Sequence, residues 1–171
     1  YNTAVGHNAG TAVTTGTDNT LIGGLSGDSL TTGAFNVAIG SRALQAEDAH
    51  GRNVAVGYSA LTTQNAGADA HNTAVGFQAG LNVTTGIENT LLGGKAGDAL
   101  TTGSYNVAIG VDALDAEDTG SRNVAIGYNS LKALNYDGNG YNVAIGFDAG
   151  KAVSTGVSNT ILGGQAGDAL T

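Results

Sequence analysis

A short repeat governs this chain of 171 residues: ten times, an Asn is followed four residues later by a Gly. The ten Asn are separated by 17, 17, 17 and 19 residues, and the same series then begins again. A period this short leaves room for one small unit per copy, so the copies must stack on one another. The sequence therefore predicts an all-β fold, a parallel β-roll or β-solenoid of ten coils.

Two repeated positions are expected to hold the coils together. The invariant Gly indicates backbone with positive φ, or backbone that passes too close to a neighbour for a side chain. The Asn side chains are expected to stack as a hydrogen-bonded ladder along the axis. The ladder positions are Asn2, Asn19, Asn36, Asn53, Asn72, Asn89, Asn106, Asn123, Asn142, Asn159, Gly6, Gly23, Gly40, Gly57, Gly76, Gly93, Gly110, Gly127, Gly146 and Gly163.

A longer repeat lies above the short one. Residues 2–71 align with residues 72–141, and residues 142–171 begin a third copy, so residues 1–171 form one solenoid of four-coil blocks. We expect this solenoid to be a segment of a longer chain. The fourth coil of each block is two residues longer, which predicts two loops on one edge, about 19 Å apart. Candidate partner-binding residues in these loops are Asn65, Asp69, Tyr136, Asp137 and Asn139.

The three residues between Asn and Gly alternate as in a strand. Because the outer two are mostly larger and β-branched, we expect them to point into the coil and the middle residue to point outward. A second short strand is expected in the return half of each coil. An outward apolar face favours contact with a neighbouring chain. The candidate interface residues are Ala38, Ala55, Ala74, Ala108, Ala125 and Ala144.

Composition excludes several classes of protein. The chain has 29 Gly but no Pro or Cys, so it can form neither a disulfide nor a Cys-based metal site. Its net charge of −8 opposes binding to nucleic acid or to an anionic membrane. No apolar stretch approaches the roughly 20 residues of a membrane span, so no membrane insertion is expected in this segment.

Chemical motifs are weak. Asp28, Asp98 and Asp168 stand in segments that resemble a calcium-binding nonapeptide, but they recur only every fourth coil. The acidic pairs at 47–48 and 117–118 are neighbours on one turn and do not face each other across a substrate. The three His residues share no spacing typical of a catalytic triad or a zinc site. We therefore expect no catalysis and no cofactor, with calcium the one alternative kept open.

Surface side chains leave two binding alternatives. Eight of the nine aromatic residues lie directly before a repeat Asn or directly after a repeat Gly, where they favour an interface or the binding of sugar rings. Thr pairs in the turns suggest an ice-binding surface. In four of the nine complete copies the corresponding residues are Asp48-Ala49, Asn65-Ala66, Asp118-Thr119 and Asn135-Tyr136, so that surface is interrupted.

The string Asn36-Val37-Ala38-Ile39-Gly40, with Ala43 three residues later, resembles the head repeats of YadA-like trimeric autotransporter adhesins. Copies such as residues 72–80 resemble the repeats of phage tail fibres and other virion appendages even more closely. The resemblance spans essentially the whole chain. It implies a left-handed roll, three chains packed side by side through the small residues of one strand, and ligand-binding surfaces displayed on a fibre.

The sequence thus predicts a non-catalytic structural and adhesive segment of a homotrimeric fibre, outside the cell on a virion or a microbial surface. Its partners would be further copies of itself and a cell-surface receptor or glycan. The alternatives are a self-assembling extracellular filament and an ice- or glycan-binding solenoid.

Overall fold

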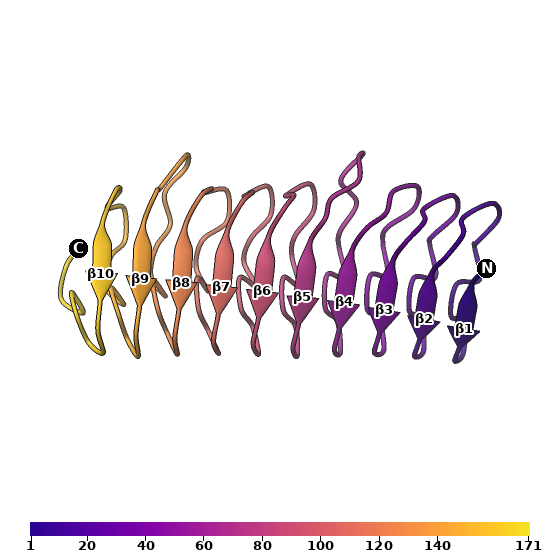
Figure 1. Cartoon of the computed structure of the whole chain (residues 1–171), viewed down its shortest axis with the longest axis horizontal. Helices are drawn as coiled ribbons and strands as arrows, with labels where there is room; N and C mark the ends of the chain where they lie inside the picture. The colour runs from indigo at the N-terminus through magenta and orange to yellow at the C-terminus, as the bar shows by residue number, and fades with distance from the viewer.

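A computed structural model describes residues 1–171, the whole chain, as ten stacked coils without a helix. Each coil runs from one repeat Asn to the residue before the next and contributes one strand to a single sheet (Figure 1). The strands are β1 (Thr3–Val5), β2 (Thr20–Ile22), β3 (Val37–Ile39), β4 (Val54–Val56), β5 (Thr73–Val75), β6 (Thr90–Leu92), β7 (Val107–Ile109), β8 (Val124–Ile126), β9 (Val143–Ile145) and β10 (Thr160–Leu162).

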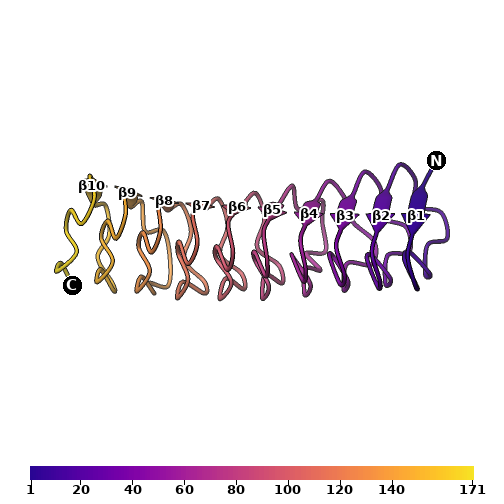
Figure 2. The ribbon, with the colours of Figure 1, turned by 90° about the horizontal axis from the view of Figure 1, so that it is seen from below.

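The sheet is parallel throughout, and its spatial order is the order of the sequence, from β1 to β10. Equivalent residues pair at every step: Ala38 lies opposite Ala55, and Ala55 opposite Ala74 across a longer coil. The two extra residues of that coil therefore do not change the register. Figure 2 shows all ten strands along one side of the rod. The expected β-solenoid is confirmed.

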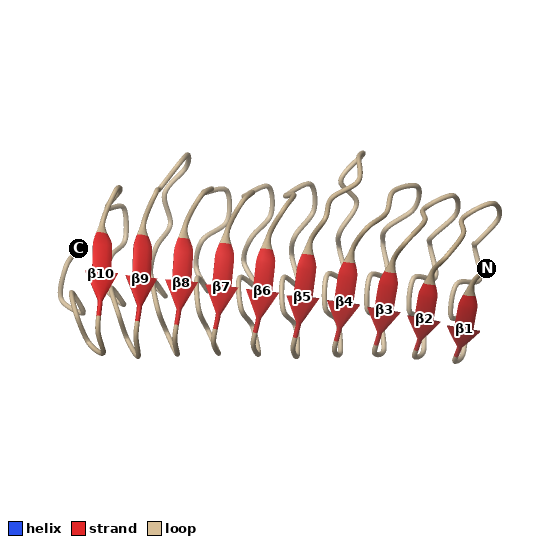
Figure 3. Cartoon of the chain, in the orientation of Figure 1, coloured by secondary structure: helices blue, strands red, loops and turns tan.

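The expected second strand of each coil is absent. The return half of every coil is built from turns, so one strand per coil remains (Figure 3). In every coil, the sixth and eighth residues after the Asn have positive φ, for example 61° at Arg42 and 50° at Leu44. Extended backbone requires negative φ, so no strand can form there. Main-chain hydrogen bonds still join the return halves of neighbouring coils. Only 18 of the 103 main-chain hydrogen bonds lie within strands, and the others lie in the turns and loops.

The inside of each coil is lined by the middle strand residue, which reverses the direction predicted from the sequence. Ala38 has no exposed surface, whereas Val37 and Ile39 on either side of it are half-buried. The interior is narrow and also receives Ala43 and Leu44 from the return half, so the strand can contribute only a small residue. The predicted interface is therefore wrong for all six residues, which belong to the core: Ala38, Ala55, Ala74, Ala108, Ala125 and Ala144.

The middle strand residue is larger in the coils where Gly, rather than Leu, occupies the eighth position of both that coil and the preceding one. Leu21 fills the middle of β2, and the eighth position is Gly in that coil and in the preceding one. A Cβ atom at Gly27 would lie 2.8 Å from Leu21 Cδ2, and a Cβ atom at Gly10 would lie 2.6 Å from Leu21 Cδ1. Leu91 and Ile161 are likewise packed against Gly at the eighth position of their own coil and of the preceding coil. Each coil thus holds a similar volume of apolar side chain.

The repeat Gly meets both requirements inferred from the sequence. All ten have φ between 119° and 144°, which L-residues rarely adopt. A Cβ atom at Gly23 would lie 2.6 Å from the carbonyl carbon of Gly40 in the next coil. At the nine positions that are followed by another coil, a side chain would both strain its own backbone and clash with the backbone of that next coil.

The repeat Asn form a continuous column, buried from Asn19 to Asn142, with two kinds of bond. At all nine steps, the main-chain N–H of one Asn donates to Oδ1 of the preceding Asn, at 2.8–3.3 Å. In most coils the Asn Nδ2 also donates to a carbonyl fourteen residues later, as Asn19 does to Gly33 at 2.9 Å. One side chain therefore joins its neighbour and closes its own coil.

Candidate functional surface

The outer face of the sheet is an uncharged surface that extends over all ten coils. Strand residues alternate in direction, so the residues on either side of each buried middle residue face outward. These outward positions contain only Thr, Val, Ile and Leu, and most are half-buried, with Val75 39% exposed. They are Thr3, Val5, Thr20, Ile22, Val37, Ile39, Val54, Val56, Thr73, Val75, Thr90, Leu92, Val107, Ile109, Val124, Ile126, Val143, Ile145, Thr160 and Leu162.

Exposed aromatic residues lie just beyond the two ends of the strands. Tyr58 stacks on Phe77 of the next coil, with ring centroids 5.6 Å apart, and Tyr128 stacks on Phe147 at 5.4 Å. These two pairs are equivalent in the two four-coil blocks. Each ring is about half exposed, so the pairs present apolar surface to solvent.

A second kind of aromatic pair also recurs once in each block. The guanidinium of Arg52 lies 5.9 Å from the ring centroid of Phe35, and that of Arg122 lies 4.8 Å from Tyr105. Both distances fall within the range of a cation–π contact. Both rings remain exposed, at 56% for Phe35 and 42% for Tyr105.

The two longer coils project on the same edge of the rod, one after β4 and one after β8 (Figure 1). Asn65 is exposed, and Asp69 accepts a hydrogen bond from the Gly51 main chain and pairs with Arg52 at 3.4 Å. The first loop is therefore fastened to the coil before it.

In the second loop, Asn139 accepts from Arg122 Nε at 3.0 Å, and Asp137 accepts from the Thr119 hydroxyl at 2.6 Å. Tyr136 packs against the core rather than projecting from the loop. Of the five candidate loop residues, Asn65, Asp69, Asp137 and Asn139 remain at the surface.

Three polar side chains in the core were not anticipated. Glu47, Gln64 and Glu117 have no exposed surface and occupy the column that holds Val or Leu in the other coils. Burial raises the pKa of both Glu residues above the ordinary value of 4.5. The sequence carried a signal: in a column otherwise aliphatic, a polar residue points inward as the aliphatic ones do.

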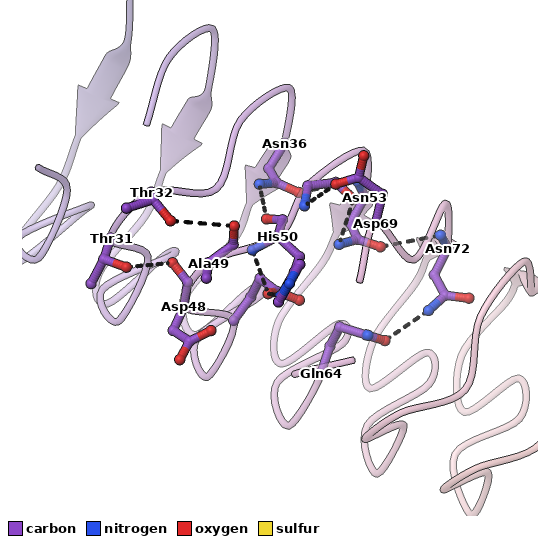
Figure 4. Close-up of polar contacts among 12 residues, drawn as sticks. Thr31, Thr32, Asn36, Asp48, Ala49, His50, Asn53, Gln64, Asp69 and Asn72 are labelled. Atoms are coloured by element: carbon purple, nitrogen blue, oxygen red, sulfur yellow. Dashed lines mark hydrogen bonds and ion pairs between the residues drawn. The ribbon is translucent and has the colours of Figure 1, made fainter. Parts of the chain in front are cut away.

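The two buried carboxylates have different partners. Glu117 accepts hydrogen bonds at both oxygens, from the main-chain N–H of Gly120 at 2.7 Å and of Tyr136 at 3.2 Å. Glu47 accepts only from the His50 main chain, at 3.1 Å on Oε1, and its buried Oε2 has no partner. Figure 4 shows the turn that carries Asp48 and His50 beside the Asn column.

Asp98 and Asp115 form an acidic pair at the surface of the return half. Burial and a hydrogen bond with Asp115 raise the pKa of Asp98 from 3.8 to about 7.

The calcium candidates Asp28, Asp98 and Asp168 lie on the coils of β2, β6 and β10. Four coils separate each from the next, so the fold does not bring them together.

The structure contains no ligand-sized pocket, and it has no helix that could cross a membrane. No family model matches this chain, and no curated protein or solved structure shows significant similarity to it.

Proposed function

We propose that this chain is a segment of a structural and adhesive fibre, carried outside the cell on a virion or a microbial surface and without catalytic activity. The observation that supports the proposal best is the uncharged outer face of the sheet. It continues over ten coils in a chain whose net charge is −8. An extended exposed apolar surface is typical of a protein that associates with another.

Further copies of the chain are the proposed partners on this face. Three copies packed side by side would cover their outer faces within a closed ring, the usual form of soluble homo-oligomers. The charged residues of each copy would stay outside the contact, because the outward strand positions carry none. The contact would involve the residues that flank the buried Ala, not the Ala themselves.

Binding of a receptor or glycan is proposed for the surface that remains free. The aromatic pairs and the two projecting loops recur once per block, four coils apart, which corresponds to about 19 Å. Repeated sites on one rod allow many weak contacts to add up to firm attachment. This arrangement suits an adhesive fibre.

Light scattering coupled to size-exclusion chromatography tests the association. The trimer predicts a mass close to three times the 16.7 kDa of one chain. Ile109→Lys, on the outer face of β7, should reduce the mass to that of one chain, because it places a charge in the contact. Ala133→Lys adds the same charge at an exposed position of the return half and should leave the trimer intact.

Other masses would favour other functions. Open-ended polymers of the unchanged chain would favour the self-assembling filament, in which coils of successive chains stack end to end. A stable monomer would contradict the proposed fibre contact and favour a solenoid that binds ice or glycan as a single chain.

A further inference from the structure

One turn of the coil that begins at Asn36 brings three potential metal ligands together. Glu47, Asp48 and His50 each offer a ligand atom, and these atoms lie within 4.8 Å of one another. Glu47 reaches the group from the core, and Asp48 and His50 from the surface turn drawn in Figure 4.

Two atoms of this group are buried without a partner. Glu47 Oε2 accepts no hydrogen bond, and neither does His50 Nδ1 form one. His50 Nδ1 lies 3.7 Å from Glu47 Oε1, which is too long for a hydrogen bond. A buried carboxylate oxygen without a donor is costly, so the site favours a cation that both atoms can reach.

The second block provides the comparison. Glu117 and Asp118 repeat the two acids, but Gly120 stands where the first block has His50. There the carboxylate is satisfied at both oxygens by main-chain N–H groups. The unpartnered oxygen and the imidazole therefore occur together in the first block, and both are missing from the second.

We propose that Glu47, Asp48 and His50 bind a divalent transition-metal ion of the Zn²⁺ type. One imidazole nitrogen and two carboxylates suit Zn²⁺, whereas Ca²⁺ and Mg²⁺ favour ligand sets made only of oxygen. Around a tetrahedral Zn²⁺ with bonds of about 2.1 Å, ligand atoms lie about 3.4 Å apart. Rotation of the exposed Asp48 and the half-buried His50 side chains closes the remaining gap, and water completes the coordination.

A metal-free arrangement competes with this site. Gln64 follows Glu47 in the same buried column, and its Nε2 also lacks an acceptor. A hydrogen bond from Gln64 Nε2 to Glu47 Oε2 would satisfy both atoms without an ion. The experiment must therefore distinguish metal binding at Glu47 from a hydrogen bond between Glu47 and the Gln64 amide.

Isothermal titration calorimetry of the full chain with ZnCl₂ at neutral pH, after removal of metal with a chelator, tests the site. The proposal predicts one Zn²⁺ per chain. His50→Gly, which copies the second block, and Glu47→Gln should each weaken binding at least about tenfold. Circular dichroism in the presence of the chelator shows whether these variants keep the fold.

Two matched controls should bind Zn²⁺ as the unchanged chain does. Glu117→Gln alters the equivalent carboxylate of the second block, and the double variant His7→Ala with His71→Ala leaves His50 as the only histidine. Absence of Zn²⁺ binding in the unchanged chain would overturn the proposal. Binding that survives in His50→Gly, or that disappears in the His7 and His71 variant, would also overturn it.

Discussion

The acidic turns at residues 47–50 and 117–120 occupy equivalent places in the two four-coil blocks, yet they treat a buried carboxylate differently. Glu117 is held at both oxygens by main-chain donors, whereas Glu47 keeps one oxygen free beside an imidazole. The scaffold around them is the same: parallel strands in register, the Asn column and the Gly column. The repeat therefore fixes the backbone, and single substitutions within it decide the local chemistry.

The largest expected effect is one that the two blocks should share. Gly57→Ala and Gly127→Ala place a Cβ on backbone with φ of 134° and 129° that also contacts the next coil. Strain and the clash with neighbouring backbone together should cost about 3 kcal/mol or more. Thermal unfolding should show similar losses for both variants. A tolerated Ala in only one block would mean that the coils do not stack equally.

Replacing each buried Glu by Gln should lower the free energy of unfolding by different amounts in the two blocks. In Glu117→Gln, the new amide must place a donor against a main-chain donor, which should cost about 1–3 kcal/mol. In Glu47→Gln, the amide can occupy the position of the unpartnered oxygen, so the loss should be smaller. Chemical denaturation in a buffer that contains a chelator measures the loss of unfolding free energy in both variants. Equal losses would indicate that Glu47 Oε2 has a donor in solution.

Stability should also depend on pH, in part through the Asp98–Asp115 pair of the second block. The pKa of Asp98 rises to about 7 through burial and through its bond and repulsion with Asp115, with Asp112 adding repulsion and Lys95 opposing it. Between about pH 4 and pH 7 the folded chain holds a proton that the unfolded chain has released, so stability falls as pH rises.

Asp115→Gln reproduces Gln45, the equivalent residue of the first block, and removes the repulsion. The difference in melting temperature between pH 5 and pH 8 should shrink in this variant, and its stability at pH 8 should exceed that of the unchanged chain. An unchanged difference would show that Asp115 does not control the titration of Asp98.

The smallest effects concern how the projecting loops are fastened. Arg52 pairs with the carboxylate of Asp69, and the equivalent Arg122 donates to the uncharged amide of Asn139. Truncation of either Arg to Ala should cost less than about 1 kcal/mol, because both contacts are exposed. The cost for Arg52 should diminish at about 1 M salt, where surface ion pairs are screened. A stronger salt effect at Arg122 would contradict this assignment.

Much of the fold could be predicted because the repeat itself dictates it. The period of Asn and Gly indicates coils, parallel register and the backbone role of the Gly, all of which the structure has. The 19-residue coils were identified as loops on one edge, and both loops project there. These features follow from spacing alone, which sequence reports directly.

The direction of the strand faces could not be obtained from alternation, because both faces are apolar. The larger residues were assigned to the interior, but a coil this narrow accepts Ala from the strand and Leu from the return half. The exchange of Leu21 with Gly10 and Gly27 was the available signal, since residues that trade volume must share one interior. The group of Glu47, Asp48 and His50 could not be found from the spacing of the His residues, because it contains only one His.

Small-angle X-ray scattering of the unchanged chain tests the central claim, a rod of stacked coils that associates along its side. Ten coils at about 4.8 Å predict a rod of about 45–50 Å. Lateral packing of three copies should thicken the cross-section and triple the mass while keeping that length. A particle that lengthens in proportion to its mass, or a globular particle without a rod-like cross-section, would contradict the account.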